Sequence, residues 1–137
     1  MNVNVFFDTN ILAYAYDLDA GGKREKAKLL LSSLWLESKK PWISVQVLQE
    51  LFVTLRKRGV EWAVAQKVTE AYTQWRVIES DVGLFRQGVA EARRWQLSFW
   101  DGLILAAARQ SGCRSLYSED FNSGQDYGGV VAVNPLL

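Results

Sequence analysis

The sequence reads Val3-Asn4-Val5-Phe6-Phe7-Asp8-Thr9-Asn10 near its start. The residues before Asp8 are mostly β-branched or aromatic, a composition typical of a short buried strand. The polar residues that follow favour turns and helix N-caps, so we expect the strand to end at Asp8 and a helix to follow through Tyr16. A carboxylate therefore stands at the carboxyl end of the first predicted strand.

The rest of the chain alternates between helical and strand-like segments. Apolar residues at three- and four-residue spacings predict helices, and short β-branched runs predict strands. We predict helices over residues 23–37, from the cap Ser44 to Gly59, and over 61–75, 82–96 and 100–111, with strands over 42–43, 76–78, 115–117 and 130–133. This alternation predicts an α/β fold, a three-layer α/β/α sandwich around a central, mainly parallel sheet. No linker or repeat interrupts residues 1–137, so we expect a single domain.

The composition is that of a folded soluble protein. Of the 137 residues, 49% are hydrophobic and 23% are charged, and a chain of this length can bury a substantial core. The longest apolar stretch, Leu103 to Ala108, is much shorter than the roughly 20 residues that cross a bilayer. The first residues carry neither a basic region nor a cleavable apolar segment. We therefore expect a cytoplasmic protein with no membrane association.

The absence of histidine narrows the chemistry. With no histidine in the sequence, Ser-His-Asp and Cys-His nucleophiles and imidazole metal sites are excluded. The single Cys113 cannot build a thiolate zinc site. Acid–base work then falls to carboxylates, Lys, Tyr or a metal-activated water. The net charge of +1 does not by itself indicate a nucleic-acid binder, because the distribution of charge matters more than its sum.

Four carboxylates stand at positions suited to a common site. Asp8 follows the first strand, Asp101 opens the last predicted helix, and Asp120 follows the strand after that helix. Glu50 lies beside the apolar stripe of its own helix. In parallel α/β sheets the working groups gather beyond the carboxyl ends of the strands. The order of these acids therefore predicts one shared crevice, and a carboxylate cluster is suited to a hard divalent cation.

Each acid also has a purely structural explanation. Asp8 could only cap the following helix, and Ser98 and Asp101 are spaced as in a capping box. Glu50 could pair with Arg56 or Lys57 of the basic run Arg56-Lys57-Arg58, and the acids after the later strand could be solvated. That basic run could hold RNA phosphates or simply complement the dipole of its helix. The residues alone leave these alternatives open.

Four segments in combination resemble the PIN-domain ribonucleases, and in particular the VapC-type toxins of bacterial toxin–antitoxin pairs. They are Phe6-Phe7-Asp8-Thr9-Asn10-Ile11-Leu12, Gln49-Glu50-Leu51, Trp100-Asp101-Gly102-Leu103-Ile104-Leu105-Ala106-Ala107-Ala108 and Leu116-Tyr117-Ser118-Glu119-Asp120-Phe121. The resemblance extends over nearly the whole chain. It implies a PIN-like α/β/α sandwich, cleavage of RNA with Mg²⁺ or Mn²⁺, a homodimer, and a small cognate antitoxin that fills the active-site groove.

The resemblance also implies roles for individual residues. Asp8, Glu50 and Asp101 match the three principal acids of the family, which act in catalysis and metal binding. Asp120 best matches the fourth acid, with its neighbour Glu119 as the rival for that position. The residues expected to support the site are Thr9, Asn10, Ser118 and Glu119. The predicted function is thus a metal-dependent endoribonuclease, the toxin of a toxin–antitoxin pair, that hydrolyses RNA phosphodiesters with a metal-activated water held by these carboxylates.

Two other functions fit parts of the sequence. The first is a catalytically idle PIN-like module that binds RNA or a protein partner without cutting. The presence of all four acids opposes it, because phosphate is bound better by Lys and Arg than by carboxylates. The second is a phosphohydrolase or receiver-like domain with an aspartyl phosphate at Asp8. That chemistry usually pairs the nucleophile with a second acid two residues later, where this sequence has Asn10.

Overall fold

A computed structural model describes residues 4–137 of the protein, which form one five-stranded parallel sheet with flanking helices. The strands are β1 (Val5–Phe7), β2 (Trp42–Ser44), β3 (Arg76–Ile78), β4 (Ser115–Tyr117) and β5 (Val131–Val133). They lie in the order β3-β2-β1-β4-β5, and all neighbouring pairs are parallel. The predicted start of the first strand, Val3, falls outside the described residues.

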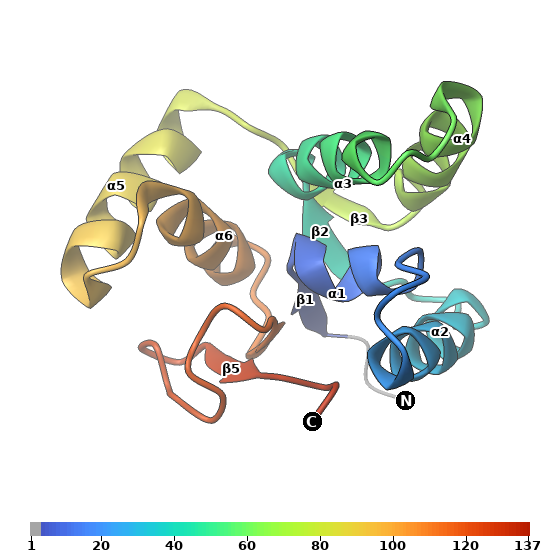
Figure 1. The fold of residues 1–137 in the computed structure, drawn as a ribbon. Coiled ribbons are helices and arrows are strands. Elements are labelled where there is room, and N and C mark those ends of the chain that lie inside the picture. Colours follow the sequence, from blue (N-terminus) through green and yellow to red (C-terminus); the bar gives the residue numbers. More distant parts are fainter. Residues whose placement is uncertain (1–3) are drawn as a thin grey trace.

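Helices cover both sides of this sheet. They are α1 (Thr9–Tyr14), α2 (Gly22–Trp35), α3 (Val45–Lys57), α4 (Trp62–Tyr72), α5 (Val82–Trp95) and α6 (Phe99–Gln110). Figure 1 shows α5 and α6 on one side of the sheet and α1 to α4 on the other. The predicted α/β fold with a parallel sheet is confirmed. No helix within residues 4–137 has the length and apolar character needed to span a bilayer.

The helix after Gly59 ends earlier than its sequence pattern predicts. It stops at Tyr72, whereas the apolar spacing continues to Trp75. The amide of Trp75 bonds to the carbonyl of Tyr72 in a tight turn at 3.0 Å, and its indole is only 3% exposed. Edge-to-face packing on Phe7 and Tyr72 draws Trp75 under the sheet. Tertiary packing therefore overrides helix propensity there and brings Arg76 into position to start β3.

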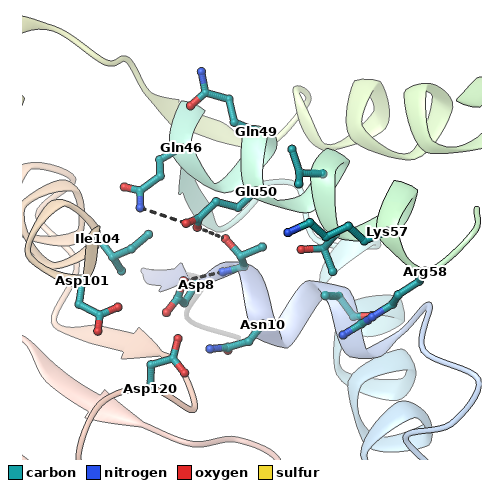
Figure 2. A pocket seen from close by; sticks show the side chains of 14 residues that line it. Asp8, Asn10, Gln46, Gln49, Glu50, Lys57, Arg58, Asp101, Ile104 and Asp120 are labelled. Carbon is teal, nitrogen blue, oxygen red and sulfur yellow. Dashed lines mark hydrogen bonds between the residues drawn. The ribbon is translucent and has the colours of Figure 1, made fainter. Parts of the chain in front are cut away.

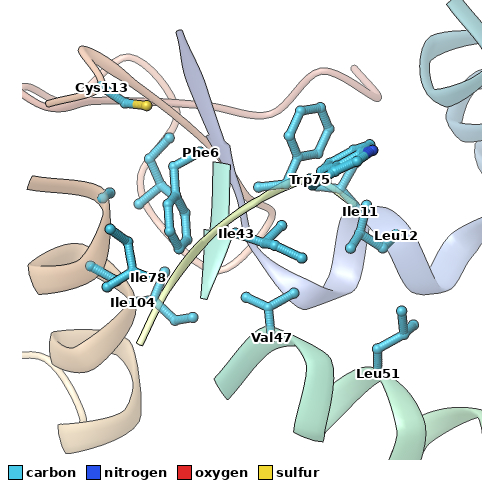
Figure 3. Close-up of a cluster of buried hydrophobic side chains, with 14 of the residues drawn as sticks. Phe6, Ile11, Leu12, Ile43, Val47, Leu51, Trp75, Ile78, Ile104 and Cys113 are labelled. Atoms are coloured by element: carbon cyan, nitrogen blue, oxygen red, sulfur yellow. The ribbon is translucent and has the colours of Figure 1, made fainter. Parts of the chain in front are cut away.

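The core lies on both faces of β1. Phe6 and Phe7 are completely buried and point to opposite faces, as successive strand residues do. Figure 3 shows Phe6 on the side of Ile104 from α6, while Ile43 from β2 lies on the side of Val47 from α3. Burying a side chain as large as phenylalanine contributes about 1.5–3 kcal/mol to stability. The two faces together fix the plane and the end of β1.

The strand order brings the ends of β1 and β4 together. The chain winds outward from β1 through β2 to β3, then returns through α5 and α6 to place β4 on the other side of β1. Phe7 pairs with Tyr117, and the amide of Asp8 donates to the Tyr117 carbonyl at 2.9 Å. Ligands in such sheets bind at this reversal point, beyond the carboxyl ends of the strands. Asp8 and the segment that starts at Ser118 therefore lie side by side.

Glycine allows α5 and α6 to approach closely near Asp101. A Cβ added at Gly102 would lie 2.5 Å from the Gly88 carbonyl oxygen and 2.7 Å from the Ala92 Cβ. Both contacts are far inside van der Waals distance. The absence of a side chain at Gly102 thus sets the spacing of the two helices and the position of the residue before it.

We expect Gly102→Ala to lower the free energy of unfolding by about 1–3 kcal/mol, because overpacking outweighs the gain in helix propensity. Urea denaturation measures this loss. Gly22→Ala is the matched control, since an added Cβ at Gly22 meets nothing within 4 Å, and it should leave stability unchanged or raise it. Equal stabilities of wild type and Gly102→Ala would show that the helices are not held at this spacing.

Candidate active site

A pocket of about 490 Å³ opens beyond the carboxyl ends of β1 and β4. Its walls come from α1, α3, α6 and the segment after β4, and all four predicted acids line it. Figure 2 shows the carboxylates of Asp8, Asp101 and Asp120 directed toward one another, with Glu50 beside them. The single crevice predicted from the order of the acids is therefore present, although the catalytic role of each acid stays a prediction.

Asp8 is the most deeply buried of these acids, with 3% of the residue exposed. Its Oδ1 accepts a hydrogen bond from the Thr9 amide at 2.7 Å, and its Oδ2 accepts one from the Ser118 hydroxyl at 2.7 Å. Asp8 thus caps α1, as its structural explanation predicted, and still faces the pocket. Burial raises the pKa of Asp8 to about 7, against the opposing effect of the two hydrogen bonds. The charges of Asp120 and Glu50 contribute to this rise.

Asp101 also combines a structural and a pocket-facing position. It lies in the first turn of α6, and its amide donates to the Ser98 hydroxyl at 3.1 Å, as expected of a capping serine. Its own side chain points into the pocket (Figure 2). Partial burial raises the pKa of Asp101, and the charge of Asp120 raises it further.

Asp120 and Glu119 point in different directions. Asp120 faces Asp8, and its amide donates to the same Ser118 hydroxyl at 3.0 Å. Glu119 instead accepts hydrogen bonds from the Tyr14 hydroxyl at 2.5 Å and the Lys23 ammonium at 2.8 Å. Partial burial raises the pKa of Glu119, but the bonds from Lys23 and Tyr14 outweigh it and lower the pKa overall. Of the two rivals, the structure places Asp120 among the clustered acids.

Glu50 stands next to the cluster and is held by neutral partners. Its Oε1 accepts a hydrogen bond from the Thr9 hydroxyl at 2.7 Å, and its Oε2 accepts one from the Gln46 amide at 3.4 Å. Within residues 4–137 it makes no ion pair with Arg56 or Lys57, so that structural explanation is wrong. Thr9 therefore connects two of the predicted acids, since its amide bonds to Asp8 and its hydroxyl to Glu50.

Two amide side chains complete the acid end of the pocket. Gln46, which sequence reasoning missed, bonds to Glu50 and to the Trp100 carbonyl at 3.2 Å, and so connects α3 to α6. The signal for it was its position one helical turn before Glu50. Asn10 accepts a hydrogen bond from the Glu119 amide at 3.3 Å, and its buried Nδ2 has no partner within the described part of the chain.

The three clustered carboxylates fit one divalent cation. One oxygen from each of Asp8, Asp101 and Asp120 can be chosen so that all three lie within 4.8 Å of one another. Oxygens that coordinate one ion at about 2.0–2.6 Å cannot be farther apart than about 5 Å. No lysine or arginine pairs with these three acids in the structure from residue 4 onward. No basic side chain among residues 4–137 therefore compensates their charge, and the donor set is that of a hard cation.

The sequence profile described as "PIN domain" matches residues 5–123. The chain belongs to the PIN-domain family. This PIN domain has no match among proteins of curated function. Its fold is similar to that of VapC20 from Mycobacterium tuberculosis, described as a toxin that cleaves the sarcin–ricin loop. The TM-score is 0.68 at 23% identity, covering 86% of this chain and 89% of the other.

A second solved structure is a toxin–antitoxin complex from Klebsiella pneumoniae. One of its chains is 26% identical to this PIN domain, with a TM-score of 0.67, and the match covers 96% of this chain and 97% of the other. The clustered acids Asp8 and Asp101 fall within the profile match, as does Asp120. The carboxylate cluster is thus consistent with the active site of a nuclease of this family.

The raised pKa of Asp8 predicts how stability depends on pH in the metal-free protein. Between the ordinary pKa of 3.8 and the folded value of about 7, the folded state binds more protons than the unfolded state. The free energy of unfolding should therefore fall as pH rises through this window, by about 4 kcal/mol from this group alone. Denaturant titrations in EDTA at a series of pH values measure the change.

The matched variant for this measurement is Asp8→Asn, which keeps the shape and cannot ionise. The difference in stability between Asp8→Asn and wild type should grow with pH in favour of the variant. A difference that stays constant between pH 4 and pH 8 would contradict the burial of a charged carboxylate at this position.

Metal binding should distinguish the two rival acids, Asp120 and Glu119. We expect Mn²⁺ to raise the melting temperature of the wild type, by the equivalent of about 2.7 kcal/mol at a metal concentration of roughly 100 Kd. Asp120→Asn should lose most of this stabilisation, whereas Glu119→Gln should keep it. If Glu119→Gln loses the stabilisation and Asp120→Asn keeps it, Glu119 is the metal-binding acid and Asp120 is not.

Proposed function

We propose that this PIN domain is a metal-dependent endoribonuclease that acts as the toxin of a toxin–antitoxin pair in the cytoplasm. The observation that carries the proposal is the convergence of Asp8, Asp101 and Asp120, whose oxygens lie within 4.8 Å of one another in an open pocket. Family membership supports the same conclusion, because a PIN domain with its acids gathered in this way resembles the VapC ribonuclease toxins.

Asp8, Asp101 and Asp120 would hold Mg²⁺ or Mn²⁺, with Glu50 beside them. When bound, such an ion polarises the phosphodiester, lowers the pKa of a coordinated water and neutralises charge on the phosphate. Hydrogen bonds within the protein hold Asp8, Glu50 and the Asp120 backbone. Ser118 bonds to both Asp8 and the Asp120 backbone, and Thr9 bonds to both Asp8 and Glu50. The Ser118 hydroxyl orients the Asp8 carboxylate and the Thr9 hydroxyl orients that of Glu50, which reduces the reorganisation that catalysis requires at these two acids.

In this proposal Glu50 orients the attacking water or takes its proton. Glu50 lies outside the set of three oxygen ligands but lines the same pocket. Its two hydrogen bonds come from neutral side chains, Thr9 and Gln46, so its charge is not neutralised by a cation. A carboxylate that is held next to a metal site can accept a proton from a water on the reacting side.

We further propose a homodimer and a small antitoxin as partners. The likeness to a chain of the Klebsiella toxin–antitoxin complex over 96% of this sequence supports the antitoxin. An apolar stripe on α5 supports a protein contact: Val82 is 63%, Phe85 53% and Val89 46% exposed. Exposed apolar residues that follow one helix face in this way commonly mark protein interfaces.

Asp8→Asn and Asp101→Asn should each reduce RNA cleavage at least about 100-fold, the size of loss that follows removal of one group that stabilises transition-state charge. The assay compares cleavage of total cellular RNA with Mn²⁺ and with EDTA, and circular dichroism checks the fold. Glu61→Gln is the matched control, because Glu61 is exposed and lies outside the pocket. Full activity of Asp8→Asn would end the proposal, and a folded wild type that binds RNA without cutting it would favour the idle binding module.

A further inference from the structure

One face of α3 runs the length of the pocket. The residues of this helix that line the pocket are Gln46, Gln49, Glu50, Val53, Thr54 and Lys57. They recur every three or four residues and so lie along a single stripe. The stripe begins beside the clustered acids and ends at the C-terminus of the helix, where Lys57 and Arg58 supply the basic end of the pocket.

Lys57 is the uncommitted cation at that end. Its side chain is exposed, and it makes no hydrogen bond or ion pair with any residue between 4 and 137. Figure 2 shows its ammonium group extended over the pocket toward Glu50. Arg58 differs, because it donates to the Ala13 carbonyl at 3.0 Å and lies 3.6 Å from the Asp17 carboxylate.

Complementing the helix dipole does not account for this arrangement. Arg56 is also in the last turn of α3 and meets that need equally well. It turns away from the pocket, donates to the Val60 carbonyl at 3.0 Å and stacks over the Trp62 ring at 5.3 Å. Lys57 instead shares a pocket with four carboxylates, which repel a phosphate chain. A free cation in the same pocket offsets that repulsion for an anionic substrate.

We propose that Lys57 binds a backbone phosphate of single-stranded RNA that flanks the scissile bond. Lys57 follows Glu50 by seven positions, so their backbones are about 10 Å apart along the helix axis. The clustered acids lie at the other end of this helix face, and in this proposal they take the scissile phosphate while Lys57 takes a neighbouring one. Lys57 acts as a substrate-positioning residue that is independent of base identity, and the inference rests on the proposed ribonuclease function.

The test measures binding and cleavage separately. Binding of a short, labelled single-stranded RNA of mixed sequence is titrated by anisotropy over a range of salt concentrations, in an Asp101→Asn background that blocks cleavage. Lys57→Ala should weaken binding several-fold and make the plot of log Kd against log salt shallower by about 0.7, the effect of one phosphate contact on a single strand. Lys57→Arg should restore the slope.

Lys67→Ala is the matched control, since Lys67 is exposed on α4 and outside the pocket. This variant should behave as wild type. In the cleavage-competent protein, Lys57→Ala should raise KM with little change in kcat.

The outcomes distinguish the Lys57–phosphate contact from the ribonuclease function. If wild type cleaves RNA but Lys57→Ala and Lys67→Ala give the same salt slope and KM, the inference is overturned and the ribonuclease function stands. A lower melting temperature of Lys57→Ala with an unchanged slope also overturns it, because that is the result of a helix-dipole role. The inference is also overturned if Lys57→Ala weakens binding to an acidic protein partner but not binding to RNA. If RNA is bound with the predicted slope change but is not cut, the nuclease proposal fails and the phosphate contact stands. RNA that is neither bound nor cut overturns both.

Discussion

The Asp8 carboxylate is removed from water at the end of the central strand, next to the charges of Asp120 and Glu50. Two hydrogen bonds, from the Thr9 amide and the Ser118 hydroxyl, are its only compensation among the described residues. Burying a carboxylate without a cationic partner is unfavourable. Such an arrangement persists because the packing of β1 on both faces enforces it, and a bound divalent cation would relieve it. Much of the site follows from this one constraint.

The fold supplies the constraint through its strand order. β1 and β4 are neighbours although more than a hundred residues separate them, and their register places Asp8 beside Ser118. Ser118 then holds the backbone of Asp120, while α6 brings Asp101 from a third direction, at a spacing that Gly102 permits. Hydrogen bonds connect the acid end of the pocket, and the same stripe of α3 continues to Lys57. The pocket thus has opposite charges at its two ends, as suits a substrate that is a chain of phosphates.

The sequence predicted what depends on local patterns. The end of β1 at Asp8, the cap at Ser44 and the strands at 76–78 and 115–117 are visible in residue type and spacing, and the structure has them. Details set by distant contacts were not predictable. The direction of Glu119 depends on Tyr14 and Lys23, about a hundred residues earlier, and the end of α4 depends on the burial of Trp75 beneath Phe7. The alternatives posed for Asp8 and Asp101 were not exclusive, because Asp8 caps α1, Asp101 donates its amide to the Ser98 cap, and both acids face the pocket.

The most direct test of the central claim is an anomalous-difference map from crystals of the protein soaked in Mn²⁺. A single shared ion predicts a peak about 2.0–2.6 Å from one carboxylate oxygen of each of Asp8, Asp101 and Asp120. A fully occupied peak elsewhere on the surface, with none between these three side chains, would contradict it.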